Sequence, residues 1–167
     1  IYSAIGEQIA ALDSRGIAWE IVPGVPAFAA AAARIGKELT VPEVAQTVIL
    51  TRTSTRSSAM PPGEDLATLA QSRATLAIHL SAKVLPRIVD ELTPFYGGDC
   101  PAILVEKATW PDERIIEATL ATIAGKVAAA GILRTAIIFV GHGLDARAAT
   151  TSRLYAADHD RHLKPAT

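Results

Sequence analysis

Residues 20–36, EIVPGVPAFAAAAARIG, join an apolar, β-branched run to an alanine-dense segment. A Pro-Gly pair closes the run, so we expect a strand at 17–22. Pro26 suits the first position of a helix, because its φ angle is already helical and its missing N–H would have no intrahelical partner. Gly36 is typical of the residue that follows a helix. The stretch therefore predicts a strand, a tight turn and a helix at 26–35.

Strands and helices alternate along the rest of the chain. We expect strands at 47–52, 74–80, 101–107, 114–118 and 134–140, and helices at 2–14, 64–72, 82–93 (interrupted near Pro86) and 119–130. Four of the strands, which contain VILTR, LAIHL, AILVE and AIIFV, are apolar on both faces. Such strands are typical of a sheet that helices cover on both sides, so the sequence predicts an α/β fold.

The composition argues against several classes of protein. The 167 residues fit one or two small domains, and 50% of them are hydrophobic. The 16 basic and 17 acidic residues give a net charge of −1, which argues against a nucleic-acid-binding domain. No apolar run reaches the roughly 18 residues expected of a membrane span. The single cysteine, Cys100, excludes an internal disulfide, and no Cys or His cluster has the spacing of a zinc site. We expect a cytoplasmic protein without a resident metal.

The first residues look like the continuation of a longer chain. Ile1 is not a methionine, and neither a charged segment nor an apolar signal segment follows it. Helical periodicity begins almost at once, with Ile5, Ile9 and Leu12 on one face. We therefore interpret the sequence as a fragment of a longer protein.

The start of the alanine helix is a candidate ligand site. In α/β sheets, ligands bind beyond the carboxyl ends of strands, and the first N–H groups of a helix attract negative or polar ligand atoms. The small side chains that follow Pro26 would let a ligand approach the backbone closely. A close-packed connection between strand and helix explains the same residues without a ligand. No G-x-G-x-x-G or P-loop motif accompanies the stretch, so classical nucleotide binding is not supported.

Two further loops follow strands. Residues 51–63, TRTSTRSSAMPPG, carry Arg52 and Arg56, and arginine pairs with carboxylates or phosphates in bidentate geometry. A solvated loop without a ligand fits them as well. Residues 105–114, VEKATWPDER, place small residues before Trp110, which suits either stacking on a flat ligand or packing as a lid.

No reactive side-chain group stands out. His79 lies in an apolar strand, which predicts a core or strand-end histidine with its hydrogen bonds satisfied, and His142 lies in a Gly-His-Gly turn. We find no nucleophile elbow, no catalytic carboxylate pair and no candidate catalytic base. Any chemistry would rest on the positioning of two ligands.

Several separated segments together resemble one family. IYSAIGEQ resembles the end of a GDPSIYS motif, and WEIVPGVPAFAAAAARIG, TVILTRTSTRSSAMP, LAIHLSAK, ILVEKATWPDE and TAIIFVGHGL follow in the family's order up to about residue 145. These are motifs of the tetrapyrrole methylases, which use S-adenosylmethionine to methylate corrin or porphyrin precursors. The TRTS loop and the ATWPDE segment favour a corrin branch that acts on a precorrin in cobalamin biosynthesis over the siroheme-forming enzymes.

The resemblance implies a class III methyltransferase fold with two α/β domains and the cofactor cleft between them. Residues 1–24 would be the carboxyl-terminal remnant of the first domain, and residues 25–167 the second domain with a polar tail. The family's glycine-rich start, G-x-G-P-G-D, is absent from this sequence. Family members are commonly homodimers, so the resemblance also implies a homodimer.

The resemblance also assigns site residues. The positions that match cofactor-binding ones are Ile1, Pro26, Ala27, Leu80, Ala108, Thr135 and Ala136. It implies that the cofactor is recognised largely by backbone, which explains the small side chains. Arg52 and Arg56 are our candidates for binding the acetate and propionate groups of the substrate. The implied reaction is direct, in-line methyl transfer that leaves S-adenosylhomocysteine.

Two functions other than the implied methylation of a precorrin stay open. The first is a tetrapyrrole methylase that acts at a different ring carbon or on a different precursor. The second is a binding or structural fragment without catalysis. A Rossmann dehydrogenase lacks its fingerprint here.

Overall fold

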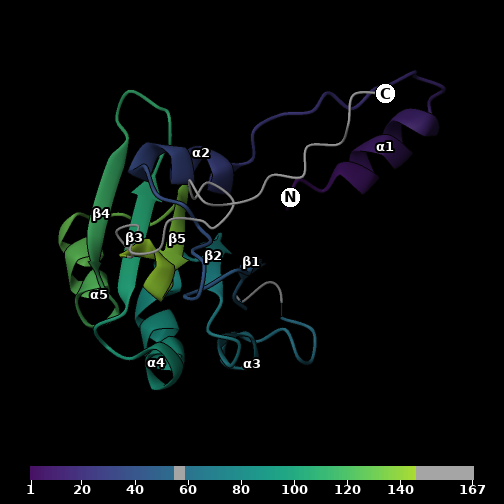
Figure 1. Ribbon diagram of the computed structural model, residues 1–167. Helices are drawn as coiled ribbons and strands as arrows, with labels where there is room; N and C mark the ends of the chain where they lie inside the picture. The colour runs from purple at the N-terminus through teal and green to yellow at the C-terminus, as the bar shows by residue number, and fades with distance from the viewer. Residues whose placement is uncertain (55–58, 146–167) are drawn as a thin grey trace, which may run out of the picture.

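The computed structural model describes residues 1–54 and 59–145, which form a mixed α/β fold (Figure 1). The helices are α1 (Ile5–Asp13), α2 (Ala27–Ile35), α3 (Leu66–Ala70), α4 (Leu85–Tyr96) and α5 (Leu120–Ala129), with 3-10 turns η1 (Ala82–Val84) and η2 (His142–Leu144). The strands are β1 (Val48–Arg52), β2 (Thr75–His79), β3 (Pro101–Glu106), β4 (Arg114–Thr119) and β5 (Ala136–Val140). The α/β prediction is confirmed.

The five strands form one sheet in the order β1-β2-β5-β3-β4. β1 and β2 are parallel, whereas β5 pairs antiparallel with both β2 and β3, and β4 pairs antiparallel with β3. The pairing of Ile78 with Ile138 and of Leu104 with Ile138 fixes the register of the three central strands. The sheet is therefore mixed, with β5 at its centre.

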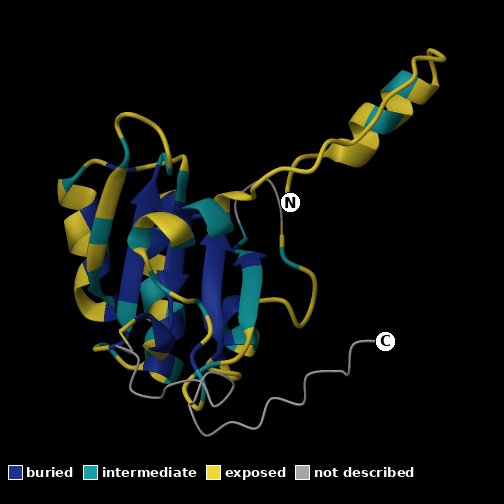
Figure 2. Cartoon of the chain, turned by 45° about the horizontal axis from the view of Figure 1, so that its top comes forward, coloured by how far each residue is buried: buried dark blue, intermediate teal, exposed yellow. Residues whose placement is uncertain are grey.

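Helices cover both faces of the sheet, as the two-sided apolar strands predict. On one face, α3, α4 and α5 pack on alternate strand residues, among them Leu76, Leu104 and Ile138. On the other face, α2 packs on the intervening residues, which include Phe139. Figure 2 shows these central strands as the most buried part of the molecule. The sheet thus has an α4/α5 face and an α2 face.

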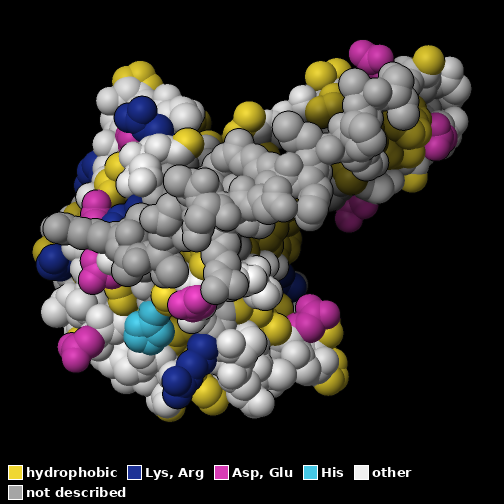
Figure 3. Space-filling model, viewed as in Figure 1, with side chains coloured by type: hydrophobic (Ala, Val, Ile, Leu, Met, Phe, Trp, Pro, Cys, Tyr) yellow, Lys and Arg dark blue, Asp and Glu magenta, His cyan; other side chains and the backbone are white. Residues whose placement is uncertain are grey.

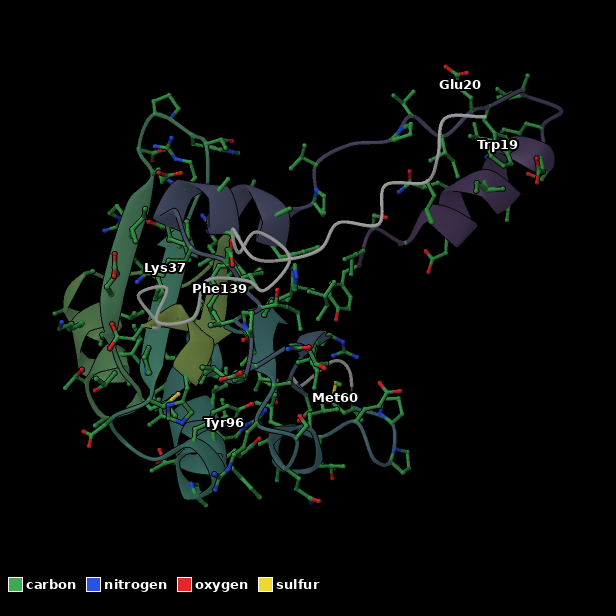
Figure 4. The ribbon with its side chains drawn as sticks, viewed as in Figure 1. Trp19, Glu20, Lys37, Met60, Tyr96 and Phe139 are labelled. Atoms are coloured by element: carbon green, nitrogen blue, oxygen red, sulfur yellow. The ribbon has the colours of Figure 1, made fainter. Side chains whose placement is uncertain are left out.

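The first 25 residues project from the sheet as an amino-terminal arm that contains α1 (Figure 1). None of the α1 residues is buried, although Ile9 and Leu12 are half-covered. The arm folds back on itself, since Trp19 Nε1 donates a hydrogen bond of 2.8 Å to Asp13 Oδ1. Hydrophobic side chains are open to solvent along it, and Figure 4 places Trp19 far from Phe139 of the sheet (Figures 3 and 4).

The strand expected at 17–22 is wrong. These residues have no regular secondary structure, and Ile21 and Val22 are 61% and 75% exposed. A strand is stabilised by its hydrogen-bonded neighbour, and no described strand lies beside this segment. Its β-branched composition is therefore not sufficient to form a strand here.

Two helices differ in detail from the sequence prediction. Pro26 is the N-cap of α2, with φ −73° and ψ 155°, so the helix begins one residue later than expected. Gly36 ends it in the left-handed conformation (φ 63°), as predicted. The segment expected at 82–93 divides into η1 and α4. Pro86 lies in the first turn of α4, where its missing N–H costs no helical hydrogen bond.

We predict opposite effects for two glycine-to-alanine substitutions. A Cβ on Gly141 would lie 3.1 Å from both Cα and Oγ1 of Thr75, so Gly141→Ala crowds the end of β5 against β2. The expected loss is about 1–3 kcal/mol of unfolding free energy, measured by urea denaturation. Gly125→Ala is the control, since Gly125 is an exposed position of α5 with nothing within 4 Å of the added carbon. It should gain about 0.5–1 kcal/mol. Equal effects would contradict the close contact at Gly141.

Candidate active site

One edge of the sheet gathers most of the residues that the resemblance assigns to the cofactor. β2 ends at His79 and β3 ends at Glu106, while the antiparallel β5 begins at the same edge. Glu106 pairs directly with Ala136. Continuing the β2–β5 register beyond Ile78 and Ile138 places Leu80 opposite Ala136. We call this the site edge; the β3–β4 loop projects from it (Figure 1).

The backbone turns sharply at the site edge. Leu80, Lys107, Thr109 and Thr135 all adopt left-handed φ angles, of 56°, 49°, 71° and 55°. Non-glycine residues occupy this region rarely and tend to do so at functional sites. The Thr135 carbonyl accepts a hydrogen bond of 2.8 Å from the Lys107 N–H, which joins two of these turns. Leu80 is left 67% exposed.

The α2 face of the site edge is lined by small and aromatic groups. Ala108 is half-buried and packs in the same apolar cluster as Phe28 and Ala32 of α2. Pro26 and Ala27 are exposed at the beginning of this helix. The first intrahelical hydrogen bond is donated by the Ala29 N–H to the Pro26 carbonyl. The N–H groups of Ala27 and Phe28 therefore precede the helical ladder and are positioned for a polar ligand atom.

A carboxylate fixes α2 against the β3–β4 loop. The Nε–H group of Arg34 donates a bifurcated hydrogen bond to the two carboxylate oxygens of Glu113, at 2.8 and 3.0 Å, and the Thr109 N–H donates another of 2.6 Å to the same carboxylate. The Thr109 N–H and the Arg34 guanidinium both lower the pKa of Glu113. The side chain of Glu113 is only 10% exposed, although it lies in a charged turn between β3 and β4. These bonds hold Ala108 beside α2.

This interaction predicts a pH-dependent stability. The folded-state pKa of Glu113 is below its ordinary value of 4.5, so its contribution is complete above that value and is lost as the pH falls through the lowered pKa. Urea midpoints between pH 6 and pH 3 should therefore fall less steeply for Glu113→Gln than for the wild type. Glu117→Gln, at an exposed position of β4, should keep the wild-type slope. Coincident profiles for all three proteins would contradict the assignment.

The beginning of the chain reaches the end of β2. The ring of Tyr2 lies 5.3 Å from the ring of His79, measured between centroids. Ile1, which the resemblance assigns to the cofactor, precedes Tyr2 in the sequence. Ile1 is 63% exposed. Burial raises the pKa of Tyr2, with Glu64 acting in the same direction and Arg52 in the opposite one.

His79 differs from the satisfied core histidine expected from the sequence. Its side chain is 9% exposed, but its Nε2 atom has no hydrogen-bond partner. Burial lowers the pKa of the imidazole and favours its neutral form. The expectation of burial is confirmed, and the expectation of satisfied hydrogen bonds is wrong.

Of the two candidate substrate-binding arginines, the structure describes only Arg52. Arg52 ends β1, pairs in register with His79, and its Nη2 donates to the Ala59 carbonyl at 3.3 Å. Its guanidinium lies where the end of β1 meets the site edge. Arg56 lies outside the described residues.

Two pockets lie at opposite ends of the sheet. One, of about 420 Å³, borders the site edge and is lined by Lys83, Lys107, Arg134 and Thr135 among others. The other, of about 500 Å³, is lined by Cys100 and His142, where β3 begins and β5 ends. The histidine of the Gly-His-Gly turn is therefore remote from the site edge. Burial raises the pKa of the Cys100 thiol to about 11, so this thiol is unreactive at neutral pH.

No cluster of three or more His, Cys, Asp and Glu side chains within residues 1–54 and 59–145 has a geometry that could hold a metal ion. In the same ranges, no helix has the length and apolar character needed to cross a bilayer.

The sequence matches a family model over residues 1–124, and that model describes the tetrapyrrole (corrin/porphyrin) methylases. This chain belongs to the tetrapyrrole methylase family. The match includes the amino-terminal arm, α2, the carboxyl ends of β2 and β3, and the loop that carries Ala108. The resemblance read from the sequence motifs is confirmed.

Within the family, the chain is similar to several individual methyltransferases. A precorrin-4 C(11)-methyltransferase from a Sinorhizobium species is 51% identical over 164 residues, which are 98% of this chain and 65% of that protein. The crystal structure of a cobalt precorrin-4 methyltransferase matches with a TM-score of 0.82 at 40% identity, and covers 87% of this chain and 61% of that one. A uroporphyrin-III C-methyltransferase from Thermus thermophilus, solved with S-adenosylhomocysteine, matches with a TM-score of 0.66 at 25% identity and covers 84% of this chain and 60% of that one.

The methylase-family chain thus spans about two thirds of the length of the curated relatives it matches. Within this span, the structure brings Leu80, Ala108, Thr135 and Ala136 to one edge, and places Ala27 at the start of the helix that covers it. Sequence reasoning missed Arg34 and Glu113, which are 79 residues apart and carry no local signal. It also missed Tyr2, although an aromatic residue next to the expected cofactor position Ile1 was visible in the sequence.

Proposed function

We propose that this chain is part of an S-adenosylmethionine-dependent methyltransferase that converts precorrin-4 to precorrin-5 by methylation at C-11, in cobalamin biosynthesis. The observation that carries the proposal is the convergence of Leu80, Ala108, Thr135 and Ala136 on one strained sheet edge. The 51% identity to a precorrin-4 C(11)-methyltransferase supports the choice of substrate and ring position.

The residues of the site edge fit S-adenosylmethionine. Ala27, Ala108 and Ala136 leave room for a ligand to approach the backbone, and the free N–H groups at the start of α2 suit its polar atoms. Pro26, Leu80, Thr135 and Ile1 complete the proposed cofactor set. S-adenosylmethionine brings an electrophilic methyl group, so these residues need only bind it, orient it and exclude water.

The substrate is proposed to bind beside β1. A precorrin carries acetate and propionate groups, and Arg52 stands at the carboxyl end of β1 next to the site edge. Arg56, four residues later in the sequence, is proposed as a second carboxylate partner. No catalytic base is assigned.

We also propose a two-domain cleft. Residues 1–24 would belong to a first domain and residues 25–167 to the second, with the cofactor between them. The exposed apolar side chains of the arm support this division, because Ile5, Ile17, Trp19 and Ile21 are between 43% and 61% exposed. A homodimer and a cytoplasmic location stay predictions, and sedimentation analysis would test the first of them.

Calorimetry with S-adenosylhomocysteine tests the proposed cofactor site. We expect measurable binding by a chimera in which the amino-terminal part of the Sinorhizobium relative precedes Ile1, and weaker or undetectable binding by the 167-residue chain alone. Absence of binding by both proteins would contradict the methyltransferase assignment. Mass analysis of the methylated product would separate C-11 methylation from the alternative, a methylase with another ring carbon or precursor.

A substitution tests the site edge itself. In the binding-competent chimera, Ala108→Leu should weaken S-adenosylhomocysteine binding by about tenfold or more, because the larger side chain occupies space beside α2 that we assign to the ligand. Ala121→Leu, at an exposed position of α5, is the matched control and should leave affinity unchanged. Equal affinities for all three proteins would remove Ala108 from the cofactor set.

A further inference from the structure

The imidazole of His79 is the buried polar group of the site edge that the fold does not satisfy. It is on the last residue of β2, and its side chain is nine-tenths buried. Nε2 has no hydrogen-bond partner, even though neutral imidazole offers both a donor and an acceptor nitrogen. Buried polar groups are nearly always paired, so an orphan of this kind calls for a partner.

Its neighbours in the fold do not supply one. Strand alternation puts His79 on the α2 face together with Ala77. The strand register pairs His79 with Arg52 on β1. On the other side, extending the β2–β5 register by one residue pairs His79 with the apolar residue Ile137. The Tyr2 ring lies 5.3 Å away, as a tilted ring contact. His79 therefore has an apolar residue as its register neighbour on β5 and an arginine as its register neighbour on β1.

We propose that His79, in its Nε2–H tautomer, donates a hydrogen bond to a carboxylate of the bound tetrapyrrole, beside Arg52. The inference rests on the proposed function, since it names a contact of the same site with its substrate. A carboxylate oxygen accepts from an imidazole N–H and from a guanidinium at the same time, so the adjacent pair is complementary to one acetate or propionate group.

This assignment differs from a cofactor contact in its location. Leu80 and Ala108 follow the ends of β2 and β3 and Ala136 begins β5, whereas His79 pairs in register with Arg52, the last residue of β1. The proposed substrate side is thus the β1–β2 end of the site edge. His79 would there set the orientation of the tetrapyrrole relative to the methyl donor.

The test uses the binding-competent chimera and two probes, the octacarboxylate uroporphyrin III and S-adenosylhomocysteine. His79→Phe keeps an aromatic ring but removes the donor, and should raise the Kd for uroporphyrin III by about tenfold, as expected for a hydrogen bond to a charged group. His79→Gln retains an N–H donor and should stay within about threefold of the wild type. Neither substitution should change the Kd for S-adenosylhomocysteine by more than about twofold.

A matched control separates ligand binding from the loss of a buried polar group. Thr75 Oγ1 is the other buried side-chain atom without a partner in the described chain, on the same strand and face but at the far end of β2. Thr75→Val should leave both affinities unchanged. Nitrogen-15 NMR of labelled histidines gives a direct readout, since the His79 Nε2 resonance should shift with uroporphyrin III and disappear in His79→Gln.

A double-mutant cycle tests whether His79 and Arg52 share one carboxylate. If they do, the combined His79→Phe and Arg52→Ala substitutions should weaken uroporphyrin III binding by a factor that differs from the product of the single effects. The proposal is overturned if His79→Phe leaves uroporphyrin III binding unchanged, if it weakens only S-adenosylhomocysteine binding, or if the wild type binds S-adenosylhomocysteine but not the porphyrin. Failure of the wild type to bind S-adenosylhomocysteine would instead count against the proposed function.

Discussion

The antiparallel insertion of β5 between β2 and β3 is the constraint on which the site depends. β2 and β3 each run opposite to β5, so both leave the sheet at the edge where β5 enters it. Leu80 and Ala108 therefore follow strands, whereas Thr135 precedes β5 and Ala136 begins it, and all four lie at the same edge of the sheet. The abrupt changes of direction require left-handed backbone at Leu80, Lys107 and Thr135, which the hydrogen bond between Lys107 and the Thr135 carbonyl helps to hold. Strain of this kind persists only where surrounding structure determines it, and here the apolar packing on both faces of the central strands does so.

Local sequence pattern predicted most of the fold, because strands buried on both faces and helices with clear ends leave a strong signal. It failed at 17–22, where the residues favour a strand but no neighbouring strand exists to pair with them. Family motifs supplied the positions at the site edge. They could not supply the contact between Arg34 and Glu113, since it joins segments 79 residues apart and follows only from the placement of α2 over the sheet. The sequence also could not predict that His79 Nε2 lacks a hydrogen-bond partner. An apolar strand predicts burial of the ring, but whether its nitrogens are hydrogen-bonded depends on the residues that adjacent strands place beside it.

The two ends of the amino-terminal arm both lie near the site edge. At its beginning, Tyr2 contacts His79, and at its end Pro26 caps α2, whose first N–H groups face the proposed ligand. Between these two points the arm exposes apolar side chains along α1 and along the segment after it. Figure 2 shows most of this part of the chain as exposed. A surface that is apolar over this length is costly to leave in water, so it favours a covering partner. The two ends of the arm, at Tyr2 and Pro26, thus lie close to the site edge, whereas α1 projects away from the sheet.

The chemistry proposed for the site makes limited demands on side chains. A sulfonium methyl group is already electrophilic, so rate enhancement comes mainly from holding donor and acceptor carbon in line and excluding water. Small residues, backbone N–H groups and a fixed loop suffice for the donor, which agrees with the alanines and the Glu113 contact. A large polycarboxylate is different, because several of its ring carbons are chemically similar and only its orientation distinguishes them. A buried imidazole beside a guanidinium discriminates between orientations, since a pose that leaves either donor unpaired loses a charged hydrogen bond. Such selectivity arises from the positions of Arg52 and His79 on adjacent parallel strands, and requires no reactive group.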